Sequence, residues 1–112
     1  MIRALFWLSL VGITIASLVP VAMLPPQSFD VWDKAQHACA FAWLALLGLL
    51  SYPAHLPRVA VGLLLFGGGI ELAQTATGWR FGEWADLAAD FLGITMGTTV
   101  WLLVRRHRAT RT

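Results

Sequence analysis

The chain has 112 residues, enough for one small domain, and 58% of them are apolar whereas 12% are charged. Soluble domains carry roughly 25% charged residues, so this composition argues against a water-soluble fold and favours lipid as the surrounding solvent. The net charge is only +2, and most of the basic residues lie near the termini or in one short loop, which argues against a nucleic-acid-binding surface.

Four stretches of the chain have the length of about 17 to 25 mainly apolar residues that a membrane-spanning helix requires. They are residues 4–24, 35–52, 59–77 and 86–104. Each run is continuous, which favours helices that satisfy their own backbone hydrogen bonds in lipid, and proline or glycine marks each connection. The sequence therefore predicts an all-α polytopic membrane protein in which residues 1–112 form a single bundle of four transmembrane helices.

The basic residues predict how such a bundle is oriented. Six arginines fall on one side of the four spans: Arg3, Arg58, Arg105, Arg106, Arg108 and Arg111. Lys34 and Arg80 fall on the other side, so the positive-inside bias predicts that both termini are cytoplasmic, in a multi-pass protein of the bacterial cytoplasmic (inner) membrane. The first span also resembles a secretory signal peptide, but it lacks a clear cleavage site, and cleavage would leave the other spans oriented as before.

Ionisable residues interrupt three of the predicted spans at a similar depth. Glu71 lies about 9 Å inside the outer end of the third span, Asp90 lies one turn inside the start of the fourth, and His37 is close to the outer start of the second. A carboxylate in the middle of a bilayer costs about 2.5 to 3.5 kcal/mol on insertion scales and usually faces the bundle interior. We therefore expect these side chains to meet.

Helical spacing places these residues on shared faces together with glycines. The three stripes are Asp33-His37-Phe41, Gly67-Glu71-Gln74-Gly78 and Asp86-Asp90-Gly93-Gly97. The matched stripes on the third and fourth spans predict a close approach of these helices, within reach of Arg80 in the loop between them, and they equally suit a homodimer face. Lys34 is expected to point away from the face of Asp33 and to extend to the interface.

In chain order these positions form one series: Asp33-Lys34-x-x-His37-x-x-x-Phe41, Glu71-x-x-Gln74, Arg80 and Asp86-x-x-x-Asp90-x-x-Gly93-x-x-x-Gly97. The series, which covers roughly residues 33–97, resembles the VanZ-like family of small bacterial membrane proteins. The resemblance implies a four-span protein of the cell envelope. Because the family takes its name from a protein linked to resistance to the glycopeptide teicoplanin, the resemblance also implies a role in such resistance. Asn is usual in the family at the position of Asp90, and Tyr is common at that of Phe41.

Seven residues form the candidate ligand-binding site: Asp33, His37, Glu71, Gln74, Arg80, Asp86 and Asp90. Their four carboxylates outnumber the one fixed cation, so protonation, water, a cation or a cationic ligand group must offset the excess negative charge. One interpretation is an outward-facing pocket that recognises a lipidated or lipid-linked envelope ligand, such as a lipoglycopeptide. Another is a polar network that only fixes the packing of the helices.

An enzyme acting on a lipid-linked cell-wall precursor is a third interpretation, in which His37 with Glu71 or Asp90 acts as acid and base. The chain has no phosphate-binding loop and no hydrolase or metalloprotease motif, and we predict no catalytic residue. A metal fits the ligand types, but acids spaced i, i+4 are equally typical of structural networks, so no metal or other cofactor is predicted. The expected partners are the lipid bilayer and the ligand, not nucleic acid, and a homo-oligomer is left open.

Overall fold

The computed structural model describes the backbone of residues 1–18, 30–78 and 84–110 and, within these ranges, the side chains of all residues except 30–33 and 110. This part of the chain contains four α-helices and no strand. The helices are α1 (Ile2–Leu18), α2 (Asp30–Ser51), α3 (Leu56–Thr77) and α4 (Trp84–Thr110). The predicted all-α class with four helices in this order is therefore confirmed.

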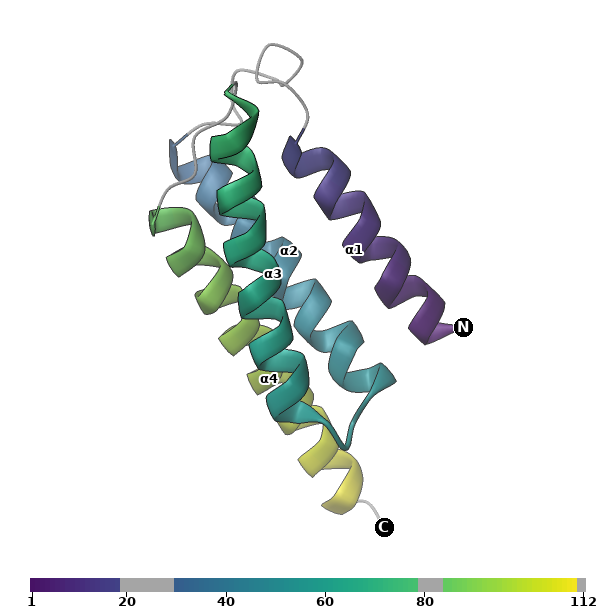
Figure 1. Cartoon of the computed structure of the whole chain (residues 1–112). Helices are drawn as coiled ribbons and strands as arrows, with labels where there is room; N and C mark the ends of the chain where they lie inside the picture. The colour runs from purple at the N-terminus through teal and green to yellow at the C-terminus, as the bar shows by residue number, and fades with distance from the viewer. Residues whose placement is uncertain (19–29, 79–83, 111–112) are drawn as a thin grey trace.

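The four helices form an elongated bundle with extents of 52 × 25 × 21 Å. Neighbouring helices in the sequence run in opposite directions, so that the start of α1, the end of α4 and the α2–α3 turn lie at the same end of the bundle (Figure 1). We call this the basic end, because the described arginines lie there: Arg3, Arg58, Arg105, Arg106 and Arg108. The opposite end, where α2 and α4 begin, is called the polar end.

The helices extend beyond the apolar runs from which they were predicted, and the largest extensions are in α2 and α4. α2 begins at Asp30 rather than at residue 35, and α4 continues to Thr110 rather than ending at residue 104. Acidic residues favour the first turn of a helix and basic residues the last, and the last turn of α4 contains His107 and Arg108. Helix polarity thus extends both elements into charged sequence. Residues 19–24 of the first predicted span, and Arg111, lie outside the described residues.

The two ends of α3 agree with the turn formers in the sequence. Pro57 lies in the first turn, where its missing N–H removes no intrahelical hydrogen bond. Gly78 caps the other end in the left-handed conformation, with φ 80°, which glycine adopts without a Cβ clash. These two residues fix the length of the helix that carries Glu71.

Two of the helices are long and apolar enough to cross a membrane, Leu56–Thr77 and Trp84–Ala109. Only 17% and 33% of their most apolar segments are buried, so most of this apolar surface faces outward instead of forming a core. Leu65, Leu72 and Leu103 are 72%, 76% and 60% exposed. Such a continuous apolar exterior is suited to contact with lipid.

α2 is the central helix and packs most extensively against α4, whereas α1 contacts α2 and α3 only. The core includes Phe41 and Leu44 from α2, Phe6 from α1, Leu63 from α3 and Ile94 from α4. Phe41 is 1% exposed, and its ring centroid lies 5.9 Å from that of Phe66. Phe41 is one helical turn further from the polar end than His37. This core therefore forms an apolar layer directly next to the polar residues, on their inner side.

Two tryptophan hydrogen bonds connect α1 to α2 and to the α2–α3 turn. The indole N–H of Trp7 donates to the Tyr52 hydroxyl at 3.0 Å, and that of Trp43 donates to the Ser9 hydroxyl at 3.1 Å. Trp43 is 47% exposed and lies far from either helix end. Its hydrogen bond to Ser9 explains how an indole N–H is accommodated at that depth.

Candidate functional site

Two pairs of polar side chains link α2 to α4 at the polar end. Lys34 Nζ donates to Asp86 Oδ1, and one turn further in, His37 Nδ1 lies 3.0 Å from Asp90 Oδ1. The α4 partners are the more buried members, because Asp86 is 4% exposed and Asp90 is fully buried. The spacing i, i+3 on α2 and i, i+4 on α4 puts both pairs on the facing sides of the two helices.

The position of Lys34 corrects the sequence-based prediction. We expected its side chain to leave the face of Asp33 and to extend to the membrane interface, but it contacts Asp86. The physical reason is that Lys34 precedes His37 by three residues and therefore shares the face of His37. Lys34 is thus a member of the site that the sequence reasoning missed, although the i, i+3 spacing was available as a signal.

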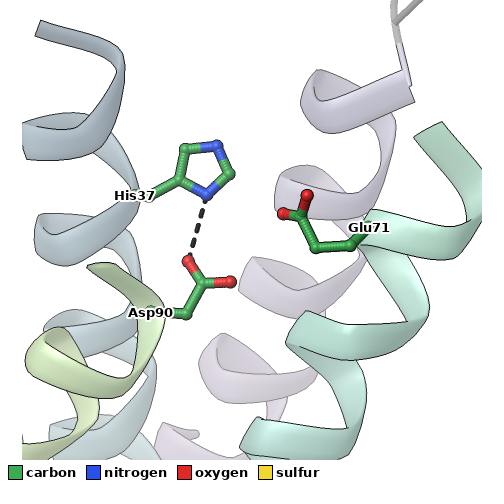
Figure 2. A group of neighbouring side chains, drawn as sticks. All are labelled: His37, Glu71 and Asp90. Carbon is green, nitrogen blue, oxygen red and sulfur yellow. Dashed lines mark hydrogen bonds and ion pairs between the residues drawn. The ribbon is translucent and has the colours of Figure 1, made fainter. Parts of the chain in front are cut away.

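Glu71 of α3 completes a cluster that spans three helices. His37, Glu71 and Asp90 each offer a nitrogen or oxygen atom within 4.8 Å of the others. Figure 2 shows the imidazole and the two carboxylates directed into the same space, each from a different helix. We call these residues the three-helix cluster.

The members of the three-helix cluster lie at one depth. Counted from the helix ends at the polar end, Glu71 and Asp90 are six residues inside and His37 is seven. With a rise of about 1.5 Å per residue, all three lie about 9 to 10.5 Å from that end. The predicted meeting of these side chains at a common depth is therefore seen in the fold.

Gly67 makes room for the cluster on α3. A Cβ at this position would lie 2.9 Å from Asp90 Oδ2 and 3.4 Å from the Phe41 ring. A larger residue would displace a carboxylate that is already fully buried. The glycine that precedes Glu71 by one turn therefore allows α3 to approach Asp90.

Gln74 follows Glu71 on the same face of α3 and has a different partner. Its side chain is 1% exposed, and Nε2 donates to the backbone carbonyl of Ser17 at 2.9 Å. Ser17 lies in the last turn of α1, where carbonyl groups lack intrahelical donors. The amide oxygen of Gln74 is buried and accepts no hydrogen bond from the described residues.

The glycine stripe of α4 packs against a different helix from the one expected. A Cβ at Gly93 would overlap the backbone carbonyl of Ala38, and one at Gly97 would overlap that of Ala42. Both alanines belong to α2, so the closest backbone approach is between α2 and α4, and not between α3 and α4 as the matched stripes predicted. Alanine at positions 38 and 42 of α2 supplies the complementary small surface.

Two of the seven predicted site residues are not placed. Arg80 and the side chain of Asp33 lie outside the described residues. Of the described members, His37, Glu71 and Asp90 lie together. Asp86 is paired instead with Lys34, which was not among the seven predicted residues. Gln74 lies on the face of Glu71 but bonds to α1.

An apolar groove adjoins the cluster on the outside of the bundle. It has a volume of about 560 Å³ and runs between α3 and α4. It is lined by Leu64, Leu65, Gly68, Gly69, Glu71, Leu72, Thr75, Trp84 and Leu87. Glu71 therefore belongs both to the groove and to the three-helix cluster, which the sequence reasoning did not foresee.

No protein-family model, curated protein or solved structure matches the chain. The assignment of chemistry to the site therefore rests on its geometry.

Proposed function

We propose that the chain is a four-span protein of the bacterial cytoplasmic membrane with both termini in the cytoplasm. α2 has 22 residues, a length of about 33 Å, which suffices to cross a hydrocarbon layer about 30 Å thick. Its polar residues at one end, among them Lys34 and His37, make it less apolar than α3. The gathering of arginines at the basic end supports the cytoplasmic assignment of that end.

Within this arrangement, the polar end recognises a lipidated or lipid-linked ligand of the cell envelope. The observation that carries this function is the double role of Glu71, which lies in both the three-helix cluster and the apolar groove. A ligand with a polar head and an acyl or prenyl chain needs such a pair of adjoining surfaces. The groove volume is within the range of about 300 to 1,000 Å³ that is typical of small-molecule sites.

The resemblance to the VanZ-like family points to the kind of ligand. A role in resistance to teicoplanin would follow if the protein binds that lipidated glycopeptide, or a lipid-linked cell-wall precursor. In either case the polar head group of the ligand lies near His37 and Asp90, and its acyl or prenyl chain lies along Leu65 and Leu72. The groove opens towards the surrounding lipid, so the ligand enters from the membrane.

Filling the groove tests this function. Leu65→Trp places an indole in the groove, whereas Val61→Trp, one turn away on α3 and outside the groove, is the matched control. With purified protein in lipid nanodiscs, we expect Leu65→Trp to weaken binding of teicoplanin, or of a polyprenyl-diphosphate-linked precursor, by about tenfold (~1.4 kcal/mol), and Val61→Trp to leave it unchanged. Absence of binding to either probe by the unmodified protein, or equal effects of the two variants, would contradict the proposal.

A structural role is the second candidate, and one observation favours it. The Lys34–Asp86 and His37–Asp90 pairs connect α2 to α4, which is also the helix pair with the closest backbone approach. Polar pairs at such a contact contribute about 0.6 to 2 kcal/mol each to helix association. Glu71 distinguishes the candidates, because it belongs to α3 and borders the groove.

A further inference from the structure

The three-helix cluster has the composition of a metal-binding site as well as that of a polar network. One imidazole and two carboxylates converge from α2, α3 and α4, with ligand atoms within 4.8 Å of one another. Two carboxylates brought together away from water repel each other, and a divalent cation between them reverses that interaction. We propose that His37, Glu71 and Asp90 bind one divalent transition-metal ion of the Zn²⁺ type.

The distances within the cluster agree with this assignment. Two ligand atoms that are each about 2.1 Å from a tetrahedral ion lie about 3.4 Å apart. His37 Nδ1 and Asp90 Oδ1 are 3.0 Å apart as a hydrogen-bonded pair, so a shared ion would require them to separate by a few tenths of an ångström. The three ligand atoms, including that of Glu71, lie within 4.8 Å of one another. To bind the same ion, the Glu71 carboxylate would have to move by a distance on the order of 1 Å, which a change of side-chain rotamer allows.

Two features of the surroundings bear on a cation site. Gly67 allows Asp90 Oδ2 to lie close to α3, because a Cβ at this position would be only 2.9 Å from that oxygen. One turn beyond Glu71, the buried amide oxygen of Gln74 accepts no hydrogen bond from the described residues. A water molecule bound to a metal donates hydrogen bonds, and an acceptor on the same helix face is the type of group that orients such a water.

The ligand set selects the type of metal. An imidazole nitrogen favours Zn²⁺ and neighbouring transition metals over Mg²⁺ and Ca²⁺, which prefer oxygen ligands. Three protein ligands leave at least one coordination position open. The open position would bind a phosphate or carboxylate of the ligand, a consequence that rests on the proposed function, whereas metal binding itself does not.

Metal binding is tested first without any lipid ligand. Protein purified without a histidine tag is stripped with chelator, and its affinity for Zn²⁺, Mn²⁺ and Mg²⁺ is measured by titration calorimetry. We expect one Zn²⁺ per chain, with binding weakened more than about tenfold by His37→Ala, Glu71→Gln and Asp90→Asn. His55→Ala, which removes an exposed histidine in the α2–α3 turn, is expected to leave the affinity within about threefold.

A second measurement does not depend on the folding of the cluster variants. The exposed residues His55 and His107 are both replaced by Ala, and X-ray absorption is recorded on the bound Zn²⁺. The proposal predicts that an imidazole ligand and oxygen ligands remain. Failure of the unmodified protein to bind Zn²⁺ stoichiometrically, or loss of the imidazole signal in the double variant, would overturn it.

The same preparations separate this inference from the proposed function. Binding of a polyprenyl diphosphate is compared in zinc-loaded and chelator-treated protein, with the expectation that loading strengthens it at least tenfold. Zinc binding without any lipid binding leaves the metal site intact and rejects the ligand function. Lipid binding by a protein that does not bind zinc rejects the metal site and leaves the ligand function intact.

Discussion

Asp86 and Lys34 show how a single residue is accommodated at the polar end. The Asp86 carboxylate is almost completely buried, while Lys34 keeps 28% of its side chain exposed. Its long stem lets the ammonium group reach an acid on α4 while part of the chain remains at the bundle surface. Loss of Lys34 would therefore leave a buried charge without this partner, whereas loss of Asp86 would leave a lysine that is already partly exposed.

Removal of Lys34 tests this asymmetry. We expect Lys34→Met to lower the free energy of unfolding by about 1 to 3 kcal/mol, because it leaves a buried carboxylate without its cation. The double variant Lys34→Met/Asp86→Leu is expected to recover most of this loss, since neither charge remains. Thermal unfolding in detergent measures both. Equal losses in the single and double variants would show that Lys34 stabilises the bundle in some other way.

The residues of the cluster were predicted more successfully than their partners. The depth and facing of His37, Glu71 and Asp90 follow from helical spacing and the cost of acids in lipid, both of which are local properties. The pairing of Asp86 with Lys34 depends on how α2 and α4 are rotated against each other. That rotation is set by backbone contacts such as Gly93 against Ala38, which no single helix determines.

At the scale of elements, the α2–α4 contact positions the site. Gly93 and Gly97 bring α4 against the backbone of α2, so that short side chains such as Asp90 reach across. The sequence predicted the order of the four helices, because apolar runs and turn formers mark them. It misplaced the start of α2 and the end of α4, because hydropathy does not register the charged turns that helix polarity stabilises.

Gly93→Ala tests the element contact. Its methyl group would overlap the Ala38 carbonyl, and backbone atoms cannot move aside as a flexible side chain can. We expect a loss of about 1 to 3 kcal/mol in the free energy of unfolding. Gly62→Ala on α3 meets no atom within 4 Å and serves as the control, with stability unchanged or slightly higher. If the two substitutions had the same effect, the helix pairing described above would be incorrect.

At the scale of the whole molecule, charge is sorted along the bundle. The described arginines gather at the basic end, the buried acids lie towards the polar end, and exposed apolar side chains cover the length between them. This distribution is expected for a protein held across a lipid layer, with its basic end on the cytoplasmic side. The arginine positions in the sequence indicated that the basic residues gather at one end of the bundle. The sequence did not indicate the groove beside Glu71, because that groove forms only when α3 and α4 are side by side.

Cysteine labelling tests the orientation. In a Cys39→Ala background, Ala54→Cys in the α2–α3 turn and Ala85→Cys at the start of α4 each provide one thiol. A membrane-impermeant maleimide added to intact cells is expected to label Ala85→Cys, and to label Ala54→Cys only after permeabilisation. The opposite labelling pattern would mean that the bundle has the inverted orientation in the membrane. Labelling of both positions from outside would rule out the four-span arrangement.

The most direct test of the central idea, that the polar end is a binding site and more than a structural network, is a paired measurement on Glu71→Gln. Its unfolding temperature and its affinity for teicoplanin or a polyprenyl-diphosphate-linked precursor are determined on one preparation in nanodiscs. We predict an unfolding temperature close to that of the unmodified protein, together with a loss of binding of at least about tenfold. A variant that loses its stability together with its binding, or that keeps both, would contradict the account.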